Sequence, residues 1–289
     1  MSEYMIENVA ELLREAREEK RALGAFNVFN LETAHAVLDA AKETDAPVVV
    51  QFTESTMDYI GGRAIFHSVK NLIGWYYPEV RAGIHLDHGK SIEIIERCVK
   101  MGVPSVMYDG SRQRLDDNID ATKRAAALCH EKGVSVQGEL GSVPYIAERA
   151  AFPDEEWDKY MTDPDEAKRF VEETGIDTLA VAIGNAHGMA KERSEPDYAR
   201  LEKIAEKVSV PIVMHGASDW DETRVREVVS RGVSCFNVDT DSRMAFVSSL
   251  AHSLQDSDGT SFNIRKILGN ARHAMKESVK KKIVMFRGG

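Results

Sequence analysis

Polar residues that can do acid–base chemistry or bind a metal recur in this sequence where short apolar runs end. Six runs end in such residues: Asp87 with His88, Asp109, Glu139, His187, His215, and Asn237 with Asp239. In a closed parallel barrel the carboxyl ends of all strands meet at one mouth, even when they are distant in sequence. The sequence therefore predicts a single site assembled from many strand ends.

Three of the 9 histidines, namely His88, His187 and His215, stand at these ends. Three imidazoles that leave one coordination position open are a frequent catalytic zinc arrangement. The alternative for each one alone is a hydrogen-bonded or capping histidine. His85 precedes His88 by three residues, but alternation of side chains along a strand disfavours both binding one metal. The other five are expected to be structural residues of helices: His35, His67, His130, His252 and His273.

Several catalytic motifs are absent from the sequence. It contains no G-x-G-x-x-G after the first run, no phosphate-binding loop of the G-x-x-x-x-G-K-[ST] type, no H-E-x-x-H and no G-x-S-x-G. No lysine lies within the apolar runs, so a Schiff-base lysine on a strand has no candidate. If this protein carries out carbon–carbon bond chemistry, a metal must therefore serve as the electron sink.

Two segments have the composition of a phosphate site. Gly216-Ala217-Ser218 follows the seventh apolar run, and Asn237-Val238-Asp239-Thr240 closes the eighth. Barrels often hold phosphate with these two loops, through backbone N–H groups and short hydroxyl side chains. Glycine and serine are also ordinary turn residues, which is the alternative explanation for each segment alone.

The elements that must position these residues alternate along the chain. Eight apolar runs have the pattern of parallel strands buried on both faces: 22–28, 47–52, 82–87, 103–108, 133–139, 177–183, 209–214 and 232–238. Segments of helical period lie between and after them: 31–45, 63–77, 91–101, 114–131, 164–174, 197–207, 221–231 and 241–255. Extra helices are expected at 6–20 and 263–283. This order predicts an α/β protein, a (β/α)8 TIM barrel forming one domain over 1–289, with an open doubly wound sheet as the alternative.

One connection is anomalous, because segment 140–162 is far longer than an ordinary strand-to-helix loop. It follows the fifth run, so in a barrel it would hang over the mouth where active sites form.

The charge and the residue composition of the chain limit what it can bind and where it can function. The 289 residues include 37 Lys and Arg against 47 Asp and Glu, a net charge of −10, which argues against nucleic acid but not against a small phosphorylated ligand. The 3 cysteines are far apart and form no C-x-x-C pair, so a reducing compartment is expected. No apolar stretch is long enough to cross a membrane, and the N-terminus lacks the apolar region of a signal peptide. We expect a cytoplasmic protein.

The motifs together resemble those of the class II, zinc-dependent ketose-bisphosphate aldolases, which include fructose-1,6-bisphosphate and tagatose-1,6-bisphosphate aldolases. The segments that carry the resemblance are HLDHG (85–89), SVMYDGS (105–111), GEL (138–140), LAVAIGNAHG (179–188), VPIVMHGAS (210–218) and FNVDTD (236–241). It extends over about residues 5–285. It implies reversible cleavage of a ketose bisphosphate to dihydroxyacetone phosphate and an aldehyde.

The resemblance also implies roles for individual residues of the metal site. His88, His187 and His215 would bind the catalytic Zn²⁺, a Lewis acid that polarises the ketose carbonyl. Asp87 would be the acid/base that moves the hydroxyl proton as the carbon–carbon bond breaks or forms. Asp109 and Glu139 resemble residues that hold a second or vacated metal position. A monovalent cation is a further ion that the resemblance allows.

Substrate-binding roles follow in the same way. The residues that resemble the phosphate cradle are Gly188, Gly216, Ser218, Asp239 and Thr240, with Lys191 nearby. Asn237 resembles a ligand of the substrate hydroxyls, and Asn27 aligns with a site residue. Arg265 matches the arginine that reaches the far phosphate of a neighbouring subunit, which implies a homodimer or homotetramer. A turn asparagine and a solvated helix charge are the alternatives for Asn27 and Arg265.

The sequence departs from the family pattern at positions that bear on specificity for the aldehyde product. A Gly-Gly-x-Glu-Asp loop with a protonating glutamate usually follows the fifth run, whereas this chain has Glu148 as its closest acidic candidate. Cys235 and Asp219 stand where lysine and glycine are usual. Asp239 and segment 51–62 favour fructose 1,6-bisphosphate over tagatose 1,6-bisphosphate or a keto-sugar acid phosphate. Two alternatives from other classes are a zinc-dependent barrel hydrolase and a catalytically silent sugar-phosphate binder.

Overall fold

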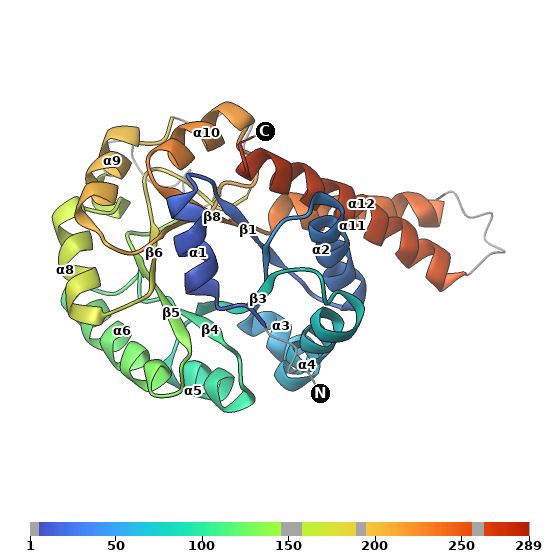
Figure 1. Ribbon diagram of the computed structural model, residues 1–289, viewed down its shortest axis with the longest axis horizontal. Coiled ribbons are helices and arrows are strands. Elements are labelled where there is room, and N and C mark those ends of the chain that lie inside the picture. The colour runs from blue at the N-terminus through green and yellow to red at the C-terminus, as the bar shows by residue number, and fades with distance from the viewer. Residues whose placement is uncertain (1–5, 146–157, 189–194, 256–262, 289) are drawn as a thin grey trace.

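The computed structural model describes residues 6–145, 158–188, 195–255 and 263–288. Its centre is a closed barrel of parallel strands that pair in the order of the chain (Figure 1). The strands are β1 (Leu23–Asn27), β2 (Val48–Thr53), β3 (Ala82–Gly89), β4 (Ser105–Tyr108), β5 (Ser135–Leu140), β6 (Thr178–Val181), β7 (Ile212–Met214) and β8 (Val233–Val238).

Helices surround the barrel of strands in the view of Figure 1. Those before and within the first half of the barrel are α1 (Val9–Glu18), α2 (Leu31–Thr44), α3 (Glu54–Ile60), α4 (Gly62–Asn71), the π-helix η1 (Leu72–Tyr76), α5 (Ile92–Met101) and α6 (Leu115–His130). Those of the second half are α8 (Pro164–Thr174), α9 (Tyr198–Lys207), α10 (Glu222–Ser230), α11 (Thr240–Gln255) and α12 (Ile264–Phe286).

The barrel closes because β1 pairs with β8, with Leu23 opposite Cys235 and Phe26 opposite Val238. The predicted TIM barrel with extra N- and C-terminal helices is confirmed, and the alternative of an open sheet is wrong. Each strand is buried over nearly its whole length, as the continuous apolar runs predicted. A sequence that buries both strand faces needs helices outside and packed side chains inside, and the barrel supplies both.

Helix α1 closes the amino end of the barrel. Asn8 caps this helix by accepting a hydrogen bond from the backbone N–H of Glu11, and its apolar stripe faces the barrel interior. The stripe and the interior residues form one buried cluster: Val9, Leu12, Leu13, Ala16, Leu23, Ala25, Val49, Met107, Ala180, Val213 and Cys235. With this end filled by side chains, the open mouth lies at the carboxyl ends of the strands.

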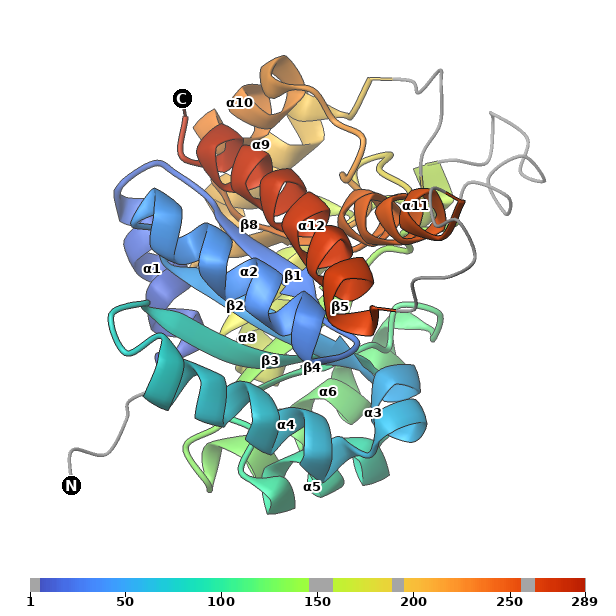
Figure 2. The same cartoon turned by 90° about the vertical axis from the view of Figure 1, so that its right-hand side faces the viewer.

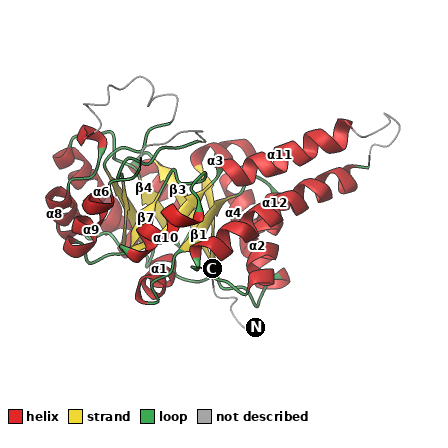
Figure 3. Cartoon of the chain, turned by 90° about the horizontal axis from the view of Figure 1, so that it is seen from above, coloured by secondary structure: helices red, strands yellow, loops and turns green. Residues whose placement is uncertain are grey.

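Helices α11 and α12 form an arm that extends beyond the barrel (Figures 1 and 3). They pack side by side, and α12 also lies along α2 (Figure 2). Large apolar side chains are exposed on the arm, with Met244 49%, Val247 57% and Ile264 67% accessible. Ser242 is the one buried residue of α11 among the described part of the chain. The arm therefore presents apolar surface that the barrel of the same chain does not cover.

The helix predicted over 63–77 is present as α4 and the π-helix η1, which together span 62–76, whereas the short helix α3 before it was not predicted. Gly61 has a φ of +91°, which ends α3 and starts α4, and the last turn of α4 widens into the π-helix η1. Most of the long connection after β5 lies outside the described residues. Within the described ranges, no helix is long and apolar enough to cross a membrane.

Candidate active site

Three histidine rings converge at the mouth of the barrel. His88 ends β3, His187 lies in the loop after β6, and His215 directly follows β7. The ring centroids are 4.8 Å apart for His88 and His215, 5.6 Å for His88 and His187, and 6.0 Å for His187 and His215. Nδ1 of His215 lies 3.1 Å from Nε2 of His88. The nitrogens are thus close enough for one ion to contact all three.

The backbone at His88 is strained. Its φ of 51° lies in the left-handed region, which a histidine rarely adopts, and the pairing of β3 with β4 shifts register between Leu86 and Gly89. The irregularity lies where the His88 ring contacts the ring of His215. Strained residues of this kind cluster at functional sites, where surrounding structure holds them in place.

The donor set fits a divalent metal ion such as Zn²⁺. One ligand atom from each of His88, His187 and His215 lies within 4.8 Å of the others. His215 is fully buried, and its Nε2 has no hydrogen-bond partner among the described residues. Burial, together with the nearby charge of His88, lowers the pKa of His215 well below its usual value, which favours the neutral imidazole that binds metals. These three residues would hold the ion.

Two carboxylates lie on the far side of His88. Oδ2 of Asp109 is 2.9 Å from Nδ1 of His88, and Oε2 of Glu139 is 3.7 Å from the same nitrogen. Burial lowers the pKa of His88, but the charges of Asp87, Asp109 and Glu139 outweigh it and raise that pKa to about 10. The surroundings of His88 thus stabilise a positive charge at this position, whether it is a proton or a metal ion. His88, Asp109 and Glu139 form a second group with metal-ligand spacing.

The pKa values of Asp109 and Glu139 are shifted in opposite directions. Burial and the charge of Asp109 raise the pKa of Glu139 well above its usual value. Burial opposes the charged form of Asp109 as well, but hydrogen bonds and charge from His88, with further hydrogen bonds from Ser111, bring its pKa below normal. A proton taken up by the pair is therefore held by Glu139 in preference to Asp109.

Asp87 is held by amide groups on both of its oxygens. Asn27 donates to Oδ2 over 2.9 Å and Asn237 donates to Oδ1 over 3.0 Å, and Gln51 donates in turn to Oδ1 of Asn27 over 2.7 Å. Burial would raise the pKa of Asp87, but the charges of His88 and His215 and the Asn27 hydrogen bond lower it overall. The carboxylate is ionised, oriented and 3.8 Å from Nε2 of His88.

The loops after β7 and β8 lie beside each other at the mouth. Gly216 has a φ of +63°, and a Cβ there would come within 2.5 Å of the Ala186 carbonyl carbon, so only glycine fits against the His187 loop. Asp239 and Thr240 stand where α11 begins, and Oδ1 of Asp239 and Oγ of Ser242 are buried without a hydrogen-bond partner among the described residues. The backbone N–H groups of this helix start and the Ser242 hydroxyl can donate to an anionic ligand, whereas the Asp239 carboxylate cannot.

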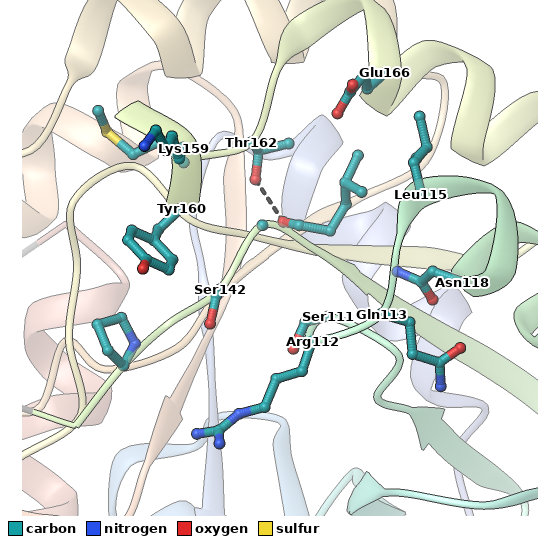
Figure 4. Close-up of a pocket in the computed structure, with 14 residues that line it drawn as sticks. Ser111, Arg112, Gln113, Leu115, Asn118, Ser142, Lys159, Tyr160, Thr162 and Glu166 are labelled. Carbon is teal, nitrogen blue, oxygen red and sulfur yellow. Dashed lines mark hydrogen bonds between the residues drawn. The ribbon is translucent and has the colours of Figure 1, made fainter. Parts of the chain in front are cut away.

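Two adjoining cavities open at the mouth, and the proposed metal ligands line one of them. One, of about 580 Å³, is lined by His88, Asp109, Glu139 and His187 together with residues of the loops after β2, β4 and β5. The second, of about 600 Å³, shares Ser111, Arg112, Gln113 and Ser142 with the first. Figure 4 shows the second cavity, which Arg112 lines from the loop after β4, and Ser142 and Lys159 line from the connection after β5. The site therefore has room for a ligand that extends well beyond the histidines.

The remaining predicted residues fall into three groups. Asn27, Asn237, Gly188, Gly216, Ser218, Asp239 and Thr240 lie at the mouth, on β1, β8 and the loops after β6, β7 and β8. Arg265 is exposed at the start of α12, on the arm (Figure 3). Glu148 and Lys191 lie outside the described residues.

Sequence reasoning missed the buried polar residues that support this site. Gln51 orients Asn27, and Asn185 donates to the carbonyl of His215 over 2.8 Å. Both interrupt apolar stretches, which is the signal that could have identified them, because buried amides need partners. His85 points instead to Ser105, with Nδ1 2.8 Å from its Oγ, and belongs to neither histidine cluster with metal spacing.

His85 leads to a prediction about stability. Burial lowers the pKa of His85 to about 4 from the ordinary 6.5, so the unfolded chain binds this proton first as the pH falls. The metal-free protein should lose on the order of 3 kcal/mol of stability from this group between pH 6.5 and 4. Urea unfolding of the chelator-treated protein across this range measures the loss. His85→Gln should remove this part of the pH dependence, whereas His67→Gln, on an exposed helix face, should not; equal slopes in all three proteins would contradict the assignment.

Comparison with known proteins identifies the family. The model of the family described as "Fructose-bisphosphate aldolase class-II" matches residues 7–288. The chain belongs to the class II fructose-bisphosphate aldolase family. The members of this family are lyases.

Relatives of the same family resemble the chain over nearly its whole length. A fructose-bisphosphate aldolase of Thermus caldophilus is 38% identical over 299 residues, covering 96% of each chain. One of Helicobacter pylori (strain J99) is 33% identical with the same coverage. Among solved structures, the YdjI aldolase from Escherichia coli K12 superposes with a TM-score of 0.84 at 29% identity and covers 99% of each chain. This class II aldolase chain is thus similar to relatives across its entire barrel and arm.

Proposed function

We propose that the protein reversibly cleaves a ketose 1,6-bisphosphate, fructose 1,6-bisphosphate being the favoured substrate, to dihydroxyacetone phosphate and glyceraldehyde 3-phosphate. The observation that carries the proposal is the convergence of His88, His187 and His215 beside the buried, doubly hydrogen-bonded Asp87. The Thermus and Helicobacter relatives are fructose-bisphosphate aldolases, which supports the choice of substrate. The 3 free, buried cysteines are consistent with a reducing, cytoplasmic location.

We assign His88, His187 and His215 as the ligands of a catalytic Zn²⁺. When bound, the ion supplies Lewis acidity toward the carbonyl oxygen of the ketose. Asp109 and Glu139 orient His88 from behind and form the second or vacated metal position. Hydrogen bonds to the outer nitrogen of a ligating histidine fix its tautomer and ring orientation, and the 2.9 Å contact between Asp109 and His88 supports this role.

Asp87 acts as the base for cleavage and the acid for synthesis. In cleavage it accepts the proton of the substrate hydroxyl next to the breaking carbon–carbon bond, and in synthesis it returns the proton to the aldehyde oxygen. The amides of Asn27 and Asn237 hold both oxygens of the carboxylate in place, and the low pKa keeps it ionised before the substrate arrives. Asn237 also contacts the substrate hydroxyls in this proposal.

The donor phosphate would bind between the loops after β7 and β8. The backbone N–H groups around Gly216 and at the start of α11, the hydroxyls of Ser218 and Thr240, and the neighbouring Gly188 are the proposed cradle, with Lys191 nearby. The half of the substrate that becomes the aldehyde would then lie on the other side of the metal site, in the cavities between the loops after β2 and β5. We propose that Glu148 donates a proton to the carbon atom of dihydroxyacetone phosphate at which the bond has broken in cleavage. In synthesis it accepts a proton from the same atom.

A panel of ketose phosphates tests the function. We expect metal-dependent cleavage to be fastest for fructose 1,6-bisphosphate among fructose, tagatose and sorbose phosphates, measured with and without the 6-phosphate. A chelator should abolish the activity and Zn²⁺ should restore it. Cleavage of a different ketose phosphate would reassign the substrate within the class, whereas full activity after removal of metal would refute the metal-dependent aldolase mechanism.

We further propose a homodimer or homotetramer in which Arg265 of one subunit binds the far phosphate in the site of its neighbour. The exposed apolar residues Met244, Val247 and Ile264 on the arm support an interface there. Arg265 stands at the start of α12 on the same arm, which projects away from the barrel of its own chain (Figure 3).

Mixing two inactive variants should restore activity if Arg265 acts across subunits. Arg265→Ala keeps its own metal site, and His215→Ala keeps its arginine, so a mixed dimer has one complete site. Random exchange of subunits should then give about one quarter of the wild-type number of complete sites. Aldol cleavage is measured after refolding the two variants together. A mixture no more active than its components would show that Arg265 does not act in the neighbour's site.

A further inference from the structure

One lysine outside the proposed catalytic set is buried next to the phosphate loops. Lys282, in the last turns of α12, is 8% exposed. Its Nζ donates to the backbone carbonyl of Ser218 and lies 3.2 Å from Oδ2 of Asp241. Ser218 belongs to the loop after β7, and Asp241 to the first turn of α11 after β8. A single ammonium group therefore joins the two segments between which the donor phosphate is proposed to bind.

This contact differs from the surface ion pairs of the same helix. Lys276 and Lys280 both pair with Glu43 of α2, whose side chain is 38% exposed; the side chain of Lys280 is also 38% exposed, and that of Lys276 is 15% exposed. In the pair of Lys282 and Asp241 the side chains are 10% and 15% exposed. A buried charge that loses its partner is costly, and the Ser218 carbonyl would lose its donor as well. The geometry of both loops therefore depends on the ammonium.

The carboxylates at the start of α11 need positively charged partners if a phosphate is to bind there. The start of α11 carries two carboxylates, Asp239 and Asp241, which would repel a phosphate dianion. Arg243 lies 3.3 Å from Oδ2 of Asp239, and Lys282 balances Asp241. The backbone N–H groups of the helix start can favour an anion only if these carboxylates are neutralised.

We infer that Lys282 is a positioning residue for the donor phosphate. It fixes the Ser218 peptide and the first turn of α11 relative to each other, and it offsets the charge of Asp241. The inference rests on the proposed function, because the ligand of the two loops is taken to be the phosphate of the donor. The residue acts through the loops it holds and touches neither the metal ligands nor Asp87.

Lys282→Met tests this role, because methionine keeps the apolar stem and removes the charge. We expect the inhibition constant of inorganic phosphate and the KM for dihydroxyacetone phosphate each to rise about 10-fold or more. Two readouts should stay unchanged: the zinc content, and the rate of deuterium exchange into unphosphorylated dihydroxyacetone. Lys281→Met, which removes the charge of the exposed neighbour, is the matched control and should behave as wild type.

A comparison of dihydroxyacetone with dihydroxyacetone phosphate distinguishes a positioning role of Lys282 from a general structural effect. If Lys282→Met lowers the exchange rate with dihydroxyacetone by the same factor as with dihydroxyacetone phosphate, the inference is wrong. It is also wrong if the variant keeps wild-type affinity for phosphate. Should Lys282→Met fail to fold, Asp241→Asn with Lys282→Met removes both buried charges together. Weak phosphate binding in that double variant would support the inference, and wild-type binding would overturn it. Absence of phosphate binding or cleavage in the wild-type protein would instead refute the proposed function.

Discussion

Replacing Asp87 by asparagine should lower kcat for aldol cleavage by about 10²–10⁴-fold, the usual contribution of a positioned acid/base. Asparagine has the same shape but cannot accept the hydroxyl proton. It also presents an amide NH₂ where Asn27 and Asn237 both donate, so one of these two hydrogen bonds is lost. The measurement is steady-state cleavage of fructose 1,6-bisphosphate, with zinc content determined on the same sample.

A half-reaction distinguishes this role from damage to the site. Exchange of the hydroxymethyl proton of dihydroxyacetone phosphate with deuterated water needs no acceptor hydroxyl, so the Asp87→Asn variant should retain most of it. Asp120→Asn, an exposed change on α6, is the control and should leave both rates unaltered. Equal losses of cleavage and exchange would show that Asp87 does not act at the acceptor oxygen.

Removal of one histidine ligand should have the second large effect. His215→Ala deletes a fully buried ring whose nitrogens face His88 and, in the proposal, the metal ion. Two remaining imidazoles hold Zn²⁺ poorly, so the purified variant should contain little zinc. Losing several kcal/mol of transition-state stabilisation corresponds to a decrease in kcat of roughly 10³-fold or more.

Metal analysis and activity are read together for this variant, and circular dichroism confirms that the barrel has formed. His67→Ala, on the exposed face of α4, is the matched control and should keep both zinc and activity. A His215→Ala protein that folds and cleaves the ketose at the wild-type rate would rule out the zinc assignment.

The fold was largely predictable because its signal is local and repeated. Strands buried on both faces must be apolar throughout, and each is followed by an amphipathic helix, so the eightfold alternation is visible in the sequence. The helix over 63–77 was predicted to within one residue at each end, but the short helix α3 over 54–60 and the π-helical turn were not. A positive φ at Gly61 and the widened turn at Leu72–Tyr76 depend on packing, and residue type alone does not specify them.

The candidate site was predictable to the extent that strand ends converge. That rule alone predicts that Asp87, His88, His187 and His215 lie at one mouth. It could not find Gln51 or Lys282, since neither stands at a strand end with reactive neighbours. Their importance comes from partners 24 and 64 residues away in sequence.

The sequence by itself determined the architecture and the set of chemical groups, because burial patterns and residue types are properties of each segment. Only the tertiary structure decided how those groups act on one another. The left-handed backbone of His88, the two amides on Asp87 and the lowered pKa of His215 arise from contacts between distant strands in a buried environment. Such contacts determine charge and orientation, and both depend on distance in space, which the order of residues does not contain.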